Sequence, residues 1–219
     1  MKILLFSVCS KFILASGFTW LGISSLQAAT VLDNRGSHTT ALVTLAPDSW
    51  HAVPIEVDGQ SYELATITVD FSDPVAGNLY AGIWSSSIFQ PGSEIETLLL
   101  VSGTGTAEKT FASLAPTVLN ANTNYYVVFG VFNGGGDAFL QVNQQDFSID
   151  QGGWTFNTGD NSVPQTTFRS VNEGATWSSD GITASPARIS IDATAIPEPT
   201  TSVMLGVFVF AAFARHRRA

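Results

Sequence analysis

Few residues of this chain could carry acid–base or nucleophilic chemistry. Between residues 30 and 196 there are two histidines, His38 and His51, and no serine stands in a nucleophile-elbow motif. His38 lies among Ser and Thr residues and His51 at the expected start of a strand, so each is interpreted as a solvated or hydrogen-bonded side chain. Glu94 and Glu96 would share one face of a strand, whereas a glycosidase needs two acids that flank a sugar-binding cleft. We therefore expect no catalytic residues, and a hydrolase is the least favoured of three functional hypotheses.

Metal binding has little support in the sequence. The single cysteine is Cys9, near the N-terminus, so the central region can hold neither a disulfide nor a cysteine-ligated metal. Two loops rich in Asn, Asp and Gly, residues 133–137 and 157–161, carry oxygen atoms of the kind that calcium prefers. The same residue types also form turns without a metal. No metal site and no cofactor is therefore predicted, and calcium stays an alternative.

Tryptophans are the best candidates for contact with a ligand. Trp50, Trp84, Trp154 and Trp177 fall at the ends of expected strands. There an indole can either stack on the apolar face of a saccharide ring or fill the core. Trp154 follows two glycines and Trp177 lies between two hydroxyl residues. We expect these two to be exposed and take them as candidate glycan-binding residues.

The charge balance excludes two classes of partner. Residues 30–196 contain four Lys and Arg residues against 17 Asp and Glu residues, a formal charge of −13. Such a surface repels nucleic acid and anionic lipid. The central region is therefore not expected to bind either of them by electrostatic attraction.

The elements that must position these residues are strands. No window of the central region has the apolar spacing of a helix, whereas alternation is frequent: Ala65, Ile67, Val69 and Phe71 would share the buried face of one strand. Many short strands without helices between them predict an all-β fold, an antiparallel β-sandwich or jelly roll. Turn formers separate the strands at residues 58–59, 73–74, 90–92, 133–136 and 179–181. Further strands are expected at residues 40–45, 50–57, 78–84, 96–102, 110–114, 125–132, 138–142, 153–156, 166–170 and 187–193.

Residues 1–29 have the parts of a secretory signal peptide. Two lysines supply positive charge, residues 12–23 form an apolar run, and cleavage is expected after Ala28 or Ala29. The alternatives are an uncleaved membrane anchor and lipid acylation at Cys9. The apolar run is shorter than the ~20 residues of a spanning helix, which favours the signal peptide.

The C-terminal end of the chain carries a second targeting signal, which has three parts. They are Pro197-Glu198-Pro199, the apolar run 203–214, and the cluster Arg215, Arg217 and Arg218. In this order they resemble the PEP-CTERM sorting signal of Gram-negative bacteria. The resemblance implies that exosortase, a membrane-embedded transpeptidase-like processing enzyme, reads the tripeptide. The arginines would stay in the cytoplasm, which agrees with the positive-inside rule.

The apolar run of the tail is short for a transmembrane helix. Its twelve residues would span ~18 Å as a helix, against a hydrocarbon core of ~30 Å. With the polar residues before it, the expected transmembrane segment is about 201–214. We interpret it as a transient anchor held until processing, and the alternative is a helix packed on the central domain.

The central region resembles a further family through several separate segments. GNLYAGIW at 77–84, QPGS at 90–93 and LNANTNYYVV at 119–128, together with Trp177 and RISI at 188–191, are similar to the choice-of-anchor R domain. Members of that family are surface β-domains that occur with one of several anchoring tails, and no catalytic residues are assigned to them. The resemblance therefore implies a surface domain without an active site.

These features divide the chain into a signal peptide (1–29), an extracellular β-domain (30–195) and a sorting tail (196–219). The β-domain is expected to be flanked by a signal helix and a short transmembrane helix. The leading hypothesis is a secreted or surface-anchored, non-catalytic protein. Its tail would hold it in the inner membrane before processing, and it would then reach the cell surface or an extracellular polysaccharide matrix. The alternative is a saccharide-binding, lectin-like module.

Overall fold

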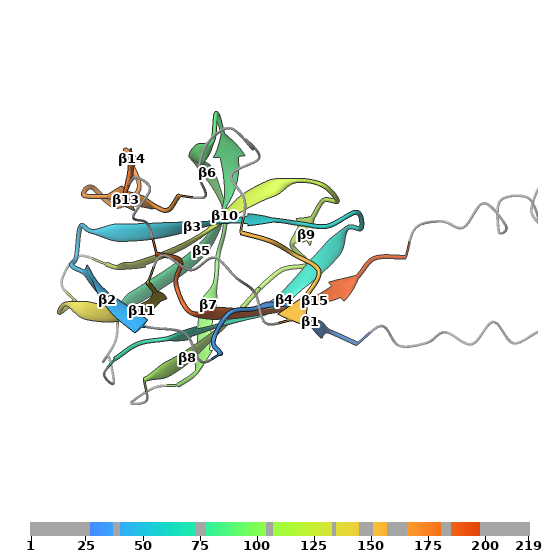
Figure 1. Ribbon diagram of the computed structural model, residues 1–219, viewed down its shortest axis with the longest axis horizontal. Coiled ribbons are helices and arrows are strands. Elements are labelled where there is room, and N and C mark those ends of the chain that lie inside the picture. Colours follow the sequence, from blue (N-terminus) through green and yellow to red (C-terminus); the bar gives the residue numbers. More distant parts are fainter. Residues whose placement is uncertain are drawn as a thin grey trace, which may run out of the picture.

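The computed structural model describes residues 27–36, 40–72, 78–103, 107–132, 135–144, 151–156, 166–180 and 185–197. Within them the chain is all-β with antiparallel sheets, which confirms the expected fold class at that level (Figure 1). These ranges contain no helix, and hence none that could cross a membrane. Several predicted features lie outside the described residues: the signal peptide up to residue 26, His38, the loop 157–161, and residues 198–219 of the tail with the transmembrane segment and the arginines.

The strands form three antiparallel sheets. They are β1 (Ala29–Asp33), β2 (Thr40–Leu45), β3 (Trp50–Glu56), β4 (Tyr62–Asp70), β5 (Leu79–Ser87), β6 (Gln90–Thr97), β7 (Leu99–Ser102), β8 (Glu108–Ala112), β9 (Val118–Leu119), β10 (Asn124–Val131), β11 (Ala138–Asn143), β12 (Gln151–Gly152), β13 (Phe168–Ser170), β14 (Ser178–Ser179) and β15 (Ile189–Ala195). A seven-stranded sheet has the order β12-β1-β15-β4-β8-β7, with β9 paired to β4. A six-stranded sheet has the order β14-β13-β3-β10-β5-β6, and a two-stranded sheet pairs β11 with β2.

The main core lies between these sheets in a sandwich-like arrangement. Figure 1 shows β3, β10 and β5 over β4, β15 and β8. Every second residue of β3 and β10 points into the core, as with Val53 and Ile55 on β3 and Val127 and Phe129 on β10. The term main core is used below for this buried apolar set, whose largest members include Leu32, Leu45, Ile55, Ile67, Phe71, Ile83, Phe111, Phe129, Trp154 and Phe156.

The buried face predicted for β4 is confirmed at three of its four positions. Ile67 and Val69 are fully buried and Phe71 is 1% exposed. The prediction is wrong at Ala65, which is only partly buried, because Leu64 points into the core in its place. The pairing of β4 with β15 shifts by one residue at this point, which is a β-bulge, and a bulge exchanges the two faces of a strand.

The β5–β6 hairpin differs from the predicted turn. Gln90-Pro91-Gly92 belongs to strand β6, and the turn lies two residues earlier, at Ile88 and Phe89. Both turn residues have positive φ (48° and 61°), as a tight two-residue hairpin requires. Pro91 is tolerated because β6 is an edge strand of the six-stranded sheet.

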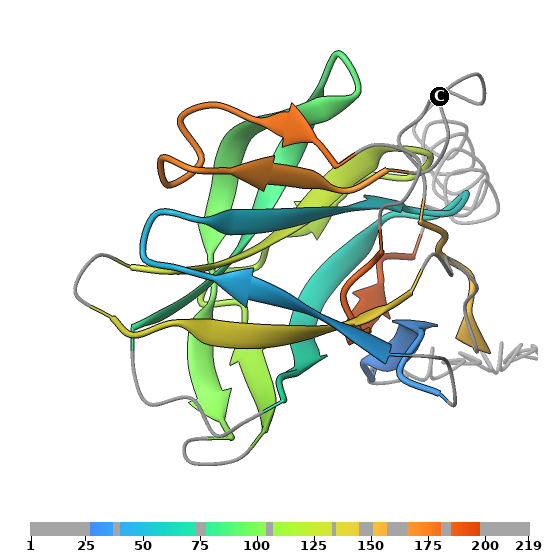
Figure 2. The same cartoon turned by 60° about the vertical axis from the view of Figure 1, so that its left-hand side comes forward.

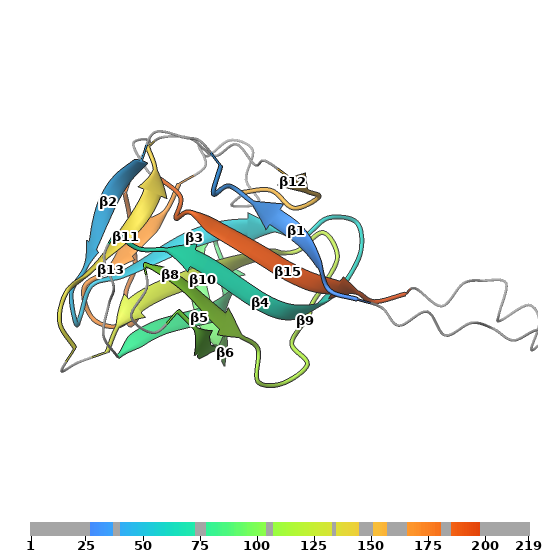
Figure 3. The same cartoon turned by 90° about the horizontal axis from the view of Figure 1, so that it is seen from below.

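The two ends of the described domain lie side by side. β1 pairs antiparallel with β15, so that Ala29 is opposite Ala193 (Figure 3). The chain is held for one more residue beyond β15, since the Ile196 N–H donates to the Ser61 carbonyl (2.9 Å) and Gln60 Nε2 donates to the Ile196 carbonyl (3.3 Å). Pro197 follows directly and is exposed.

The four cations of the central region are all engaged in structural contacts. Arg35 pairs with Glu108 (2.7 Å), and Arg188 lies 3.5 Å from Asp70. Arg169 Nε donates to Ser49 Oγ (2.9 Å). Lys109 is fully buried and its Nζ donates to the Gly103 carbonyl. The positive charges of the domain therefore serve the fold.

Candidate functional site

An open groove lies between the β5–β6 hairpin and the chain that precedes β14. It has a volume of about 710 Å³. Figure 2 shows the two walls side by side, the β5–β6 hairpin in green and the β13–β14 segment in orange. We call it the Trp177 groove, and it is lined by Ser85, Ser86, Ser87, Gln90, Pro91, Gly92, Ser93, Gly174, Ala175, Thr176 and Trp177.

The wall that carries Trp177 is fixed by its own hydrogen bonds. Ser170 Oγ accepts from the Gly174 N–H (2.8 Å), and Asn172 Oδ1 accepts from the Thr176 N–H (2.8 Å). Asn172 Nδ2 also donates to Thr176 Oγ1 (2.9 Å). Gly174 has a φ of 83°, and a Cβ at this position would lie 2.7 Å from the Trp84 ring. The loop therefore needs glycine here and holds one shape.

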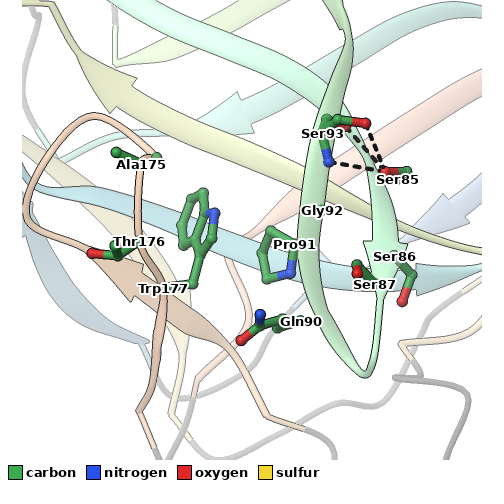
Figure 4. A pocket seen from close by; sticks show the side chains of 11 residues that line it. Ser85, Ser86, Ser87, Gln90, Pro91, Gly92, Ser93, Ala175, Thr176 and Trp177 are labelled. Atoms are coloured by element: carbon green, nitrogen blue, oxygen red, sulfur yellow. Dashed lines mark hydrogen bonds between the residues drawn. The ribbon is translucent and has the colours of Figure 1, made fainter.

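The opposite wall is the end of the β5–β6 hairpin. Ser85 Oγ accepts from the Ser93 N–H (3.0 Å) and lies 3.2 Å from Ser93 Oγ, which joins the two strands across a bulge. Figure 4 shows the indole of Trp177 facing Pro91 across the groove, with Gln90 and Ser87 on the same wall as Pro91. This wall offers hydroxyl and amide groups around one apolar ring.

Trp177 is half-buried, and its ring is held from behind. It packs edge-on against Trp84, with ring centroids 5.5 Å apart and an interplanar angle of 82°. Its Nε1 is buried, and among the described residues it has no hydrogen-bond partner. The predicted exposure of Trp177 is met in part, since part of the indole contributes to the groove lining.

Behind Trp177, the outer face of the six-stranded sheet carries a second apolar layer. We call it the outer aromatic cluster, and it consists of Trp50, Ala52, Tyr80, Trp84, Tyr126, Val128 and Phe168. Trp50 stacks on Tyr80 with a centroid distance of 4.1 Å. Trp84 Nε1 donates to Tyr80 Oη (2.7 Å), which in turn donates to Glu94 (3.0 Å). Burial raises the pKa of Tyr80, so the phenol stays a neutral donor.

Glycines allow two of these rings to approach the sheet backbone closely. A Cβ at Gly130 would lie 2.2 Å from the Trp50 ring, and one at Gly82 would lie 2.2 Å from Tyr80 Oη. An aromatic ring lying over a strand glycine replaces the missing side chain and covers the backbone. The two glycines thus let Trp50 and Tyr80 approach the backbone, and these rings support Trp84 and, through it, Trp177.

The prediction that Trp154 is exposed is wrong. Its side chain is fully buried in the main core and packs edge-on against Tyr62 at 5.4 Å. The flanking glycine lies close to another segment, since a Cβ at Gly153 would lie 2.7 Å from the Asp58 carboxylate. Trp154 therefore cannot stack on a saccharide, and it is not brought together with Trp177.

Among the described residues, His51, Glu94 and Glu96 were considered for catalysis, and each makes separate contacts. His51 is buried, and its Nδ1 lies 3.6 Å from Asp180, which is long for a hydrogen bond. Burial lowers its pKa, although Asp180 opposes this. Neither residue lines the Trp177 groove. Across the described ranges, no three His, Cys, Asp or Glu side chains are grouped as a metal site would require.

Glu94 and Glu96 do not act as a pair. A bulge between β5 and β6 interrupts the alternation at this point, and each carboxylate contacts a different element. Glu94 accepts from Tyr80, whereas Glu96 accepts from Thr117 Oγ1, Ser113 Oγ and the Leu114 N–H. Burial acts to raise the pKa of Glu96, but these hydrogen bonds prevail and lower it. An anchored carboxylate of lowered pKa is unsuited to act as a general acid.

Most of the Trp177 groove was missed by sequence reasoning. The segment 90–92 was assigned to a turn, whereas it forms the wall of the groove as part of β6. The available signal was the run Ser85-Ser86-Ser87 directly after Trp84, which places hydroxyls beside an aromatic residue. No lining residue carries a formal charge. The groove can therefore bind a ligand by ring stacking and neutral hydrogen bonds, but its lining holds no general acid, no general base and no nucleophile paired with a base.

No protein-family model and no curated protein matches this sequence.

Proposed function

We propose that this chain is an exported, non-catalytic β-sandwich protein of the jelly-roll type, displayed at the surface or in the extracellular matrix of a Gram-negative bacterium. In this proposal residues 1–29 direct export, and the tail from residue 196 holds the precursor in the inner membrane until an exosortase-type enzyme processes it. The observation that carries the proposal is the pairing of β1 with β15, which brings the start and the end of the β-domain to one place.

This pairing suits a domain that has a targeting signal at each end, the signal peptide before it and the sorting tail after it. β1 begins at Ala29, where the signal peptide is expected to be removed, and β15 ends at Ala195, shortly before the Pro-Glu-Pro tripeptide. Both addresses would therefore leave the fold at the same end. The rest of the surface, including the Trp177 groove on the other sheet, would stay free of the membrane attachment.

Mass spectrometry of the protein recovered outside the producing cell tests the proposal. We expect a mature chain that starts at residue 29 or 30 and ends near residue 199. Replacing Pro197, Glu198 and Pro199 together with Ala should leave an unprocessed chain in the membrane fraction. Replacing Thr200, Thr201 and Ser202 with Ala is the matched control and should leave processing intact. An intact chain through Ala219 outside the cell, in a strain with the processing machinery, would show that the processing step is wrong.

The second candidate function is a saccharide-binding module, which was the alternative from the sequence. The observation that favours it is the Trp177 groove, where a fixed indole faces a wall of hydroxyl and amide groups. The two functions are compatible, because a displayed domain can also bind. The buried His51 and the anchored Glu96 support a non-catalytic protein in both cases.

A further inference from the structure

We infer that the Trp177 groove binds an uncharged saccharide chain, without a metal ion, with Trp177 as the stacking platform. The inference deepens the saccharide-binding candidate by naming the class of ligand and rests on it. It does not depend on export or processing of the chain. Three observations carry it: the neutrality of the lining, the fixed position of the indole, and the supply of hydrogen-bonding groups around it.

The groove lining carries no charged side chain, which favours an uncharged ligand. None of the eleven lining residues is ionisable, and seven of them are Ser, Thr, Gln or Trp, with a polar side-chain group. The charged groups closest along the chain are the acids Glu94 and Glu173. Of the four cations of the central region, Arg35 and Arg188 are in ion pairs with acids, and Arg169 and Lys109 donate to Ser49 and to the Gly103 carbonyl; none of the four lines the groove. An acidic polysaccharide would therefore meet repulsion and no counter-charge.

The indole of Trp177 is already in place before a ligand binds. Trp84 supports its ring from behind, and the hydrogen bonds of Ser170 and Asn172 fix the chain around it. A platform that is fixed in advance loses little conformational entropy on binding, which raises affinity for a weakly interacting ligand such as a sugar. One face of a pyranose ring is apolar and can stack on an indole.

The groups around the indole match the hydroxyls of a sugar. Ser87 and Gln90 stand on the facing wall and Thr176 stands beside Trp177. Hydroxyl and amide groups both donate and accept hydrogen bonds, as sugar hydroxyls do. The open shape of the groove admits a chain that continues beyond it.

Calorimetric titration of the full chain tests the inference. The chain is held in a polyoxyethylene detergent, because alkyl-glycoside detergents would themselves compete as sugars. The probes are cellohexaose, maltohexaose, mannohexaose and xylohexaose, with hexagalacturonate as the acidic comparison. We expect binding of at least one neutral hexasaccharide, no binding of hexagalacturonate, and no change when EDTA is added.

Four variants locate the binding. Trp177→Ala should weaken the affinity about tenfold or more, the size of a lost aromatic contact, and Trp177→Phe should retain part of it. Ala175→Gln adds bulk to the lining without removing a polar contact and should weaken binding as well. Phe139→Ala is the matched control, because Phe139 is another partly exposed aromatic residue (38%) but lies on β11, outside the groove. It should bind as the unaltered chain does.

Each result decides the matter. Loss of binding in Trp177→Ala and Ala175→Gln, with circular dichroism unchanged and Phe139→Ala unaffected, supports the groove as the site. Absence of binding to all four neutral probes at millimolar concentration overturns the inference. So does binding that survives both groove variants, that requires calcium, or that prefers hexagalacturonate. The mass-spectrometric test of export is independent, so that a failure of one proposal leaves the other standing.

Discussion

The six-stranded sheet carries an apolar layer on each of its faces, and the two layers differ in kind. Toward the main core, β3 and β10 present mostly aliphatic residues such as Val53, Ile55 and Val127. On the outer face the layer is mainly aromatic, lies over glycines and is covered in part by the chain segment around Gly174. Antiparallel sheets commonly leave one face to water. Here the second layer supports Trp177, so its additional burial serves the site as well as the fold.

Removing a large residue of the main core should have the largest effect. Phe129→Ala deletes a fully buried ring that several strands surround. We expect a loss of about 3–5 kcal/mol in the free energy of unfolding, because transfer and cavity costs add. Denaturant unfolding monitored by tryptophan fluorescence measures it. Phe139→Ala, at a 38% exposed position, should cost clearly less, because less of its ring is buried. Equal losses at both positions would contradict the assignment of the core.

Adding one methyl group beneath the outer aromatic cluster should have the next largest effect. Gly130→Ala would place a Cβ 2.2 Å from the Trp50 ring, so the ring must leave the sheet. The expected cost is about 1–3 kcal/mol, the range for overpacking. The near-ultraviolet circular dichroism of the tryptophans should change with it. Gly136→Ala is the control, since nothing lies within 4 Å of its Cβ position. A neutral Gly130→Ala would show that the rings do not lie on the backbone.

Lowering the pH should destabilise the fold through His51, which is buried on the core side of the six-stranded sheet. Burial lowers the pKa of His51 below its ordinary value of 6.5, with Arg169 acting in the same direction and Asp180 and the Ser185 backbone opposing. In the unfolded chain His51 therefore binds a proton near pH 6.5, whereas in the folded chain it binds one only at lower pH. Stability should be full above pH 6.5 and fall as the pH drops below it.

The variant His51→Gln isolates this contribution. Its stability should depend less on pH than that of the unaltered chain between pH 6.5 and the lowered folded-state pKa. Urea unfolding at half-unit pH steps gives the difference. Parallel curves for the two proteins would mean that His51 is protonated as readily in the folded state as in the unfolded one.

The smallest expected effect is a gain in stability at the tip of the β5–β6 hairpin. Ile88 and Phe89 occupy positive φ, which is unfavourable for a β-branched residue above all. Replacing the pair with Asn-Gly supplies the residues that this turn prefers and should stabilise the fold by about 0.5–1 kcal/mol. Thermal unfolding measures the gain. Saccharide binding should be unchanged, because neither residue lines the groove; a destabilised variant would show that the side chains at the tip make favourable contacts.

Alternation along single strands was sufficient to predict much of the fold. Residues 40–45 form β2 as predicted, and Ile67 and Val69 are buried as predicted. The error at Ala65 has a clear reason, since a β-bulge depends on the partner strand and leaves little trace in the strand that contains it. Local pattern thus predicts the face of a strand only as far as the pairing stays regular.

The candidate site was harder to predict because its walls are far apart in the sequence. Residues 85–93 and 174–177 meet only after the six-stranded sheet has formed. The two tryptophans chosen from sequence illustrate the difficulty. Both had small residues nearby, yet Trp154 lies in the main core, whereas Trp177 packs on Trp84 beside Gly174 and stays half-buried. Glycine signals close approach, but it does not tell which segment approaches.

Because Ala29 pairs antiparallel with Ala193, the domain can be transferred into another protein chain. Paired strands run about 5 Å apart, so a short peptide could join the two ends without disturbing either sheet. Such a domain can be inserted into a surface loop of a host protein, or cut open at another loop and rejoined here as a circular permutant. The hairpin tip at Ile88, which is 88% exposed, is a suitable place for the new termini.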